Sequence, residues 1–127
     1  MNNNVPESTI QLLEATELNN IDQVKALVGR GVDPNAQNEY GWTALMVAAA
    51  YGREEVAEYL LSLPTIDLEA RHEDGETALL LAAWQGHLRL IKLLLHSGAN
   101  IEAVDHEGNN VLTWAAMGVR GILAGLP

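Results

Sequence analysis

The hydrophobic and polar positions form two patterns that alternate along the chain. Short segments rich in alanine and leucine, such as 44–50 and 78–83, are apolar at nearly every position. Each is followed by a segment whose apolar residues recur at helical spacing with charged residues between them. The first pattern predicts a helix buried on most sides, and the second predicts a helix that packs on a neighbour. We predict helices at 8–18, 21–28, 43–51, 53–61, 77–85, 87–96 and 110–117.

Residues that commonly begin helices stand at several of the predicted starts. Thr43, Thr77 and Asn110 each offer a side-chain oxygen that can accept a hydrogen bond from a free amide of the first turn. Ser8–Gln11 has the spacing of a capping box, in which serine and glutamine satisfy the first amides together.

The predicted helix ends carry glycine or precede proline. Gly52 follows the helix at 43–51, and Gly29 and Gly31 offer left-handed geometry after the helix at 21–28. Pro64 disfavours helical geometry at the preceding residue, so the helix at 53–61 should end by Ser62.

The whole pattern repeats at a nearly fixed distance. Gly41 and Gly75 lie 34 positions apart, and Gly75 and Gly108 lie 33 positions apart. A period of this length predicts a stack of small units rather than one central core. The first unit is more polar, which suits an end of the stack with one face in solvent. We divide the single domain, residues 1–127, into a lead-in at 1–7, a capping repeat at 8–37, repeats at 38–71 and 72–105, and a partial repeat with an apolar tail at 106–127.

The repeated unit resembles the ankyrin repeat over about Ser8 to Met117. That family has a Gly-x-Thr-Pro-Leu-His-x-Ala-Ala start and a Leu-Leu…Gly-Ala-Asp/Asn end, matched here by 75–83 and 94–100. The resemblance implies an all-α solenoid of stacked helix-turn-helix units with projecting β-hairpin or turn fingers. The proline and histidine of the signature are replaced in each unit, by Ala44 and Met46, Ala78 and Leu80, and Val111 and Thr113. Because that histidine commonly ties the loop to the helix, we expect the fingers to be held less firmly.

The resemblance also implies where a partner would bind. Family members generally bind proteins through the fingers and the inner face of each unit's first helix. Carried over position by position, this predicts partner contacts at Glu39, Tyr40, Trp42, Tyr51, Glu73, Asp74, Glu76, Trp84, Gln85, His106, Glu107, Asn109 and Met117. The alternative for Trp42 and Trp84 is that they lie across neighbouring repeats and cover backbone.

Charge and composition narrow the class of partner. Seventeen acidic residues against seven basic ones give a formal charge of −10, which argues against binding to nucleic acid or to an anionic membrane surface. A protein partner with a basic surface is compatible, although solubility alone explains the same charge. The chain has no cysteine, no apolar stretch of about 18 residues and no signal-peptide pattern in its first residues. A cytoplasmic location is the default expectation.

The candidate chemistry at the fingers is limited. Acidic and aromatic residues there could hold a cationic peptide, since ring faces attract cations. We interpret His72 and His106 as equivalent positions of adjacent fingers that could share zinc. Zinc needs four ligands, however, and exposed tips seldom supply them, so we predict no metal and no cofactor. Thr43 and Thr77 are explained as caps, and no nucleophile-and-base pattern is present, so we predict no enzyme activity.

The C-terminal tail breaks the pattern. Gly118, Gly121 and Gly125 disfavour a regular second helix, although the tail retains apolar residues. We expect it to fold back over the helix at 87–96 or to be covered by another chain. A structural role, with the chain monomeric or weakly self-associating through the tail, is the alternative to a binding module. Ending the chain after Met117 should then lower the melting temperature and promote aggregation.

Overall fold

The computed structural model describes residues 5–113 and contains six complete helices. Every helix predicted within this range is present, with ends within one residue of the predicted ones. Residues 111–113 are helical and begin the last predicted helix, whose remainder lies outside the described residues, as do Met117 and the apolar tail. The helices are α1 (Glu7–Glu17), α2 (Ile21–Gly29), α3 (Ala44–Tyr51), α4 (Glu54–Leu61), α5 (Ala78–Gln85) and α6 (Leu88–His96).

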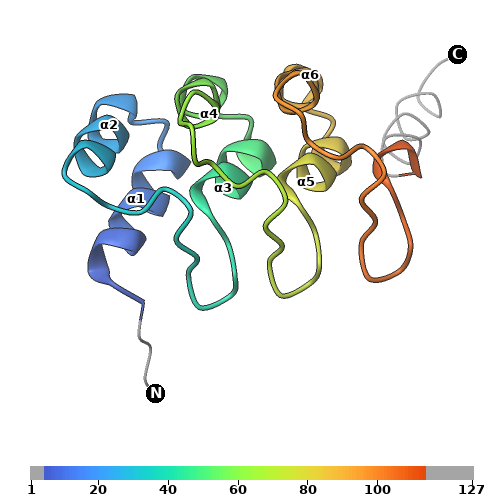
Figure 1. The fold of residues 1–127 in the computed structure, drawn as a ribbon, viewed down its shortest axis with the longest axis horizontal. Helices are drawn as coiled ribbons and strands as arrows, with labels where there is room; N and C mark the ends of the chain where they lie inside the picture. Colours follow the sequence, from blue (N-terminus) through green and yellow to red (C-terminus); the bar gives the residue numbers. More distant parts are fainter. Residues whose placement is uncertain (1–4, 114–127) are drawn as a thin grey trace, which may run out of the picture.

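The helices are arranged as three pairs in a two-layer stack (Figure 1). The first helices, α1, α3 and α5, form one row, and the second helices, α2, α4 and α6, form the other. The loops that follow each pair project on the side of the first row. No residue between 5 and 113 is in a β-strand, so this part of the chain is an all-α solenoid.

Most of the predicted helix boundaries are confirmed. Thr43 and Thr77 each accept a hydrogen bond on their hydroxyl from the amide three residues later, at 3.3 Å. Asn110 does the same through Oδ1, which accepts from the amide of Thr113 at 3.0 Å. Gly52 ends α3 in the left-handed conformation, with φ of 72°. The last residue of α4 is Leu61, as the following proline required.

Two boundary predictions are wrong. The capping box at Ser8–Gln11 does not form, because α1 begins at Glu7 and leaves Ser8 inside the first turn. The carbonyl of Pro6 accepts from the amide of Thr9 at 3.0 Å instead, without a side-chain cap. Gly29 is the last residue of α2 rather than its left-handed end, and Gly31, with φ of 101°, supplies that geometry.

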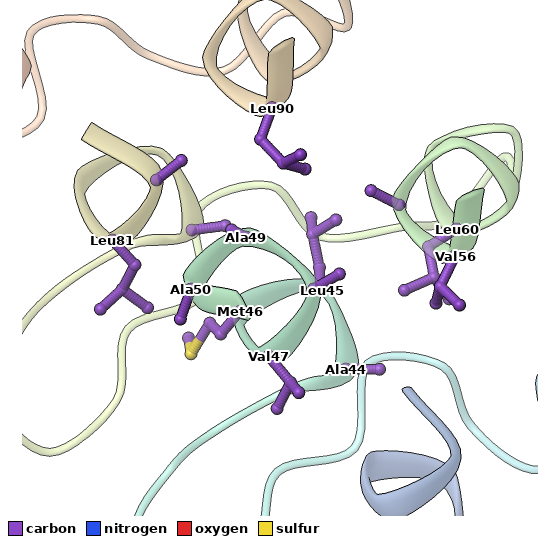
Figure 2. Packing of buried hydrophobic residues seen from close by; sticks show 14 of the residues in the cluster. Ala44, Leu45, Met46, Val47, Ala49, Ala50, Val56, Leu60, Leu81 and Leu90 are labelled. Atoms are coloured by element: carbon purple, nitrogen blue, oxygen red, sulfur yellow. The ribbon is translucent and has the colours of Figure 1, made fainter. Parts of the chain in front are cut away.

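The core runs through the stack between the two rows of helices. Residues 44–50 of α3 are all buried, and the alanines of this helix allow its neighbours to approach closely. Figure 2 shows Leu45 and Ala49 on the side of α3 that faces Leu90 of α6 and Leu60 of α4. Val47 and Ala50 lie on the opposite side of the same helix. A continuous apolar core therefore joins successive repeats.

The apolar residues on both sides of segment 87–96 predict a helix that lies between two neighbours, and α6 differs from this prediction. Leu90 and Leu94 are completely buried, whereas Leu88 is 60% exposed. Among the described residues, α6 therefore packs on α4 and α5 through one side only.

Candidate protein-binding surface

The three projecting loops, 36–42, 70–76 and 103–109, share one construction and are here called fingers 1, 2 and 3. In each, a backbone amide and a carbonyl four residues apart close a tight turn, at 2.9 to 3.3 Å. A side chain at the first position of the turn accepts from the amide two residues later, at 2.9 Å in all three cases. These pairs are Asn38 with Tyr40, His72 with Asp74, and Asp105 with Glu107.

Hydrogen bonds also join each finger to the next one. Gln37 donates through Nε2 to the carbonyl of Gly41 in its own finger and to that of Arg71 in finger 2, at 2.8 and 3.1 Å. Arg71, at the equivalent position, donates through Nη1 to the carbonyls of Gly75 and Val104, both at 2.6 Å. We expected the fingers to be held less firmly because the signature histidines are missing. These hydrogen bonds tie neighbouring fingers together without those histidines. Arg71 is accordingly a structural bridge between fingers.

His72 is the buried centre of finger 2, with 5% of its surface exposed. Its Nδ1 accepts from the amide of Asp74, and its Nε2 lies 2.8 Å from Oε1 of Glu76. The ring stacks on Trp42 of finger 1, with centroids 5.0 Å apart and planes 2° from parallel. This stacking half-buries Trp42 and supports the interpretation that it covers a neighbouring repeat.

The interpretation of His72 and His106 as equivalent positions is wrong. The position equivalent to His72 in finger 3 is Asp105, and His106 is one residue further along, where it packs beside Gly75. Both ring nitrogens of His72 already have partners. Between residues 5 and 113, no three histidine and carboxylate side chains are placed to hold a metal ion together.

A groove of about 430 Å³ lies where the first two repeats meet. One wall is a single face of α1, made by residues spaced i, i+3, i+4 and i+7. The other sides come from α3 and from finger 1, which lie next to α1 in Figure 1. The groove is lined by Ile10, Leu13, Glu14, Glu17, Asn38, Tyr40, Trp42, Val47 and Tyr51.

The rim of this groove is acidic and aromatic. Glu14 and Glu17 are exposed on α1, and none of the nine lining residues is basic. At finger 1, a hydrogen bond to the Glu39 carboxylate raises the pKa of the Tyr40 phenol, and the negative charges of Glu39 and Glu73 raise it further. Tyr40 therefore stays neutral in a region of negative potential.

The sequence comparisons agree with this architecture. The chain matches the family described as ankyrin repeats in three copies over residues 12–105, and a second match covers residues 63–123. The chain belongs to the ankyrin-repeat family. Ankyrin repeats are generally protein–protein interaction modules.

Several curated ankyrin-repeat relatives are similar to parts of the chain. Human mitochondrial disaggregase is 47% identical over 51 residues, which are 40% of this chain and 7% of that protein. Human protein phosphatase 1 regulatory subunit 27 is 40% identical over 58 residues, or 46% of this chain and 38% of that protein. The bovine inactive serine/threonine-protein kinase TEX14 is 32% identical over 105 residues, or 83% of this chain and 7% of that protein. The chain thus spans well under half the length of each.

The residues predicted from the sequence to contact a partner fall into two groups in the structure. Three take part in the fingers themselves: Trp42 stacks on His72, Glu76 pairs with the same histidine, and Asn109 donates to Asp105. The others within the described range are exposed at the fingers or at the ends of α3 and α5. They are Glu39, Tyr40, Tyr51, Glu73, Asp74, Trp84, Gln85, His106 and Glu107.

The α1 wall of the groove was not among the sites predicted from sequence. From the sequence alone, Ile10 and Leu13 belong to an apolar stripe of the first helix, and Glu14 and Glu17 are polar positions expected in solvent. The spacing of these four residues places them on one side of a helix. This spacing was the sequence signal that could have revealed the wall. Their meeting with Tyr40 and Tyr51 depends on how repeats one and two stack, which the sequence pattern of α1 alone does not specify.

The helices between 5 and 113 include none long and apolar enough to cross a membrane.

Proposed function

We propose that this ankyrin module binds a protein partner through the surface formed by its finger tips and the exposed faces of α1, α3 and α5. This surface is called the inner surface below. The observation that carries the proposal is the exposure of three large aromatic side chains there. Tyr40 is 54% exposed, Tyr51 51% and Trp84 48%.

The position of these side chains follows from helical geometry. Tyr51 lies one turn after Val47 on α3, and Trp84 lies one turn after Leu81 on the equivalent side of α5. Stacking the two helices therefore places both aromatic residues along one side of the solenoid. Half-exposed tyrosine and tryptophan are favoured in protein interfaces, because they bury a large area at a small cost in side-chain entropy.

We infer that the module acts by binding and not by catalysis. The hydroxyls of Thr43 and Thr77 are used as helix caps, and His72 is used inside its finger. His87, which follows α5, reaches the carbonyl of Ala50 through Nε2 at 3.1 Å and has a structural role between repeats. The reactive groups named here thus have structural uses that support a non-catalytic interpretation.

Affinity capture with matched surface variants tests the proposal. A Tyr51→Ala/Trp84→Ala variant should lose partners that the unaltered chain captures from a lysate of its source cells. The control is Leu88→Ala/Ile101→Ala, which also removes two exposed apolar side chains (60% and 44% exposed) but lies outside the inner surface, on α6 and in the loop after it. It should keep those partners. Circular dichroism checks that both variants are folded. If only the control variant loses its partners, the binding surface lies elsewhere.

A further inference from the structure

We infer that the groove between α1, α3 and finger 1 receives an arginine side chain from a basic segment of the protein partner. This inference rests on the proposed function and specifies the chemistry of one part of the inner surface. The groove combines three features that suit a guanidinium group with its aliphatic stem. These are an apolar floor, two exposed phenol rings and two carboxylates on the rim.

The apolar floor fits the stem of the side chain. Ile10, Leu13 and Val47 line the groove, and the last two are buried beneath its surface. A long basic side chain covers such a surface with its methylene groups while its charged end stays in polar surroundings. A partner side chain without an aliphatic stem would leave the exposed part of Ile10 in contact with water.

The rim fits the charged end. Glu14 and Glu17 lie one helical turn apart on α1, and Tyr40 and Tyr51 present exposed rings from the other sides. Guanidinium is planar, so it can stack on an aromatic face and still donate hydrogen bonds sideways to carboxylates. An ammonium group has no planar face to stack, which favours arginine over lysine here.

The chain itself shows this chemistry at the edge of the groove. The guanidinium of Arg53 lies over the ring of Tyr51, 5.9 Å from its centroid. The same side chain donates through Nε to the backbone carbonyl of Glu17 at 2.7 Å. Two of the groove's own residues thus already take up a guanidinium, and the carboxylates of Glu14 and Glu17 are not used in that contact.

The acidic recess between fingers 2 and 3 suits a cation less well. It is lined by four carboxylates and one imidazole, without a phenol or indole ring: Asp74, Glu76, Asp105, His106 and Glu107. Two of its carboxylates are committed to the fingers. Glu76 pairs with His72, and Asp105 accepts from the amides of Glu107 and Asn109. The aromatic groove is therefore the better site for arginine.

Binding of a blocked tripeptide, acetyl-Gly-Arg-Gly-amide, tests the inference by nuclear magnetic resonance. Titration into the ¹⁵N-labelled chain should shift the amides of Glu14, Glu17 and Tyr51 and the indole of Trp42. The same peptide with citrulline in place of arginine keeps the shape of the side chain and removes its charge. It should shift these signals far less at equal concentration.

Two charge-matched variants locate the site. Glu14→Gln/Glu17→Gln should weaken the arginine peptide roughly three- to tenfold, since each exposed ion pair contributes modestly. Glu55→Gln/Glu58→Gln removes the same charge from exposed positions on α4 and should change the affinity by less than about twofold. Equal binding of the citrulline peptide would overturn the inference, as would equal effects of the two variants or shifts confined to fingers 2 and 3. No binding to the unaltered chain would overturn it as well.

The two proposals fail separately. If the arginine peptide does not bind but capture of a partner still depends on Tyr51 and Trp84, the arginine site is wrong and the binding function stands. If capture does not depend on those residues, the inner surface is wrong whatever the peptide does.

Discussion

Three different side chains perform one task at equivalent positions of the fingers. Asn38, His72 and Asp105 each accept a hydrogen bond from the amide two residues later. The turn requires only an acceptor atom at this point, so an amide oxygen, a neutral imidazole nitrogen and a carboxylate all serve. His72 in finger 2 has a second role, because its aromatic ring also stacks on Trp42.

At the residue scale, the helix caps make a direct prediction. Thr77→Ala removes the hydroxyl that accepts from the amide of Leu80, and the hydroxyl is buried, so no water can replace it. We expect a loss of about 0.5–2 kcal/mol in the free energy of unfolding, measured by urea denaturation. Ser8→Ala is the matched control and should have almost no effect, because Ser8 does not cap α1. A larger loss for Ser8→Ala would contradict the assigned start of α1.

The glycines of the fingers make a second prediction. Gly41 and Gly108 have similar backbone angles, with φ of 84° and 81°. A side chain at Gly41 would lie 2.9 Å from the Cα of His72 in the next finger, whereas one at Gly108 meets no atom within 4 Å. Both alanine variants carry the same left-handed strain, so their difference measures the contact between fingers. We expect Gly41→Ala to destabilise the fold by about 1–3 kcal/mol more. Equal losses would show that fingers 1 and 2 separate easily.

At the scale of single elements, the sequence predicted where the helices lie but not which of their sides pack against neighbours. Periodicity, threonine caps and glycine ends predicted all six complete helices, because each signal is local. The start of α1 was missed, since Pro6 and the Ser8–Gln11 spacing both indicate a start and only packing decides between them. The exposure of Leu88 was missed for a related reason, because six apolar residues in α6 do not reveal which side has a neighbour.

Helix α6 contains its own control for core packing. Leu94 is completely buried and Leu88 is 60% exposed on the same helix, so helix propensity cancels between the two alanine variants. We expect Leu94→Ala to cost about 2–5 kcal/mol and Leu88→Ala to stay within about 0.5 kcal/mol. Thermal and urea unfolding measure both. Comparable losses would mean that Leu88 is covered in solution.

At the scale of the whole molecule, the solenoid builds a surface that no single repeat contains. The groove draws on residues 10–17, 38–42 and 47–51, which belong to two repeats and a finger. The resemblance to ankyrin repeats indicated the finger and α3 residues, since those positions follow the family pattern. The contribution of α1 depends on the stacking of a first repeat whose front half departs from that pattern.

The acidic charge of the whole surface makes a kinetic prediction. If it guides a basic partner, the association rate should fall as salt rises, because the Debye length shrinks from about 10 Å at 0.1 M to about 3 Å at 1 M. Glu73→Lys/Asp74→Lys should lower the rate further, and more than Glu55→Lys/Glu58→Lys on α4. Stopped-flow measurement with a captured partner tests both. A rate indifferent to salt and to position would leave the acids as solubilising groups.

Site-specific photocrosslinking tests the central claim, that partners bind the inner surface, most directly. The photoreactive residue p-benzoylphenylalanine would replace Tyr51 or Trp84 on that surface, and Leu88 or Ile101 outside it, in four separate variants. All four positions are between 44% and 60% exposed, so each tolerates a large side chain. After irradiation in the source cells, we expect the variants at 51 and 84 to crosslink a common protein that those at 88 and 101 do not. Crosslinks to a common protein from 88 and 101, with none from 51 and 84, would contradict the account.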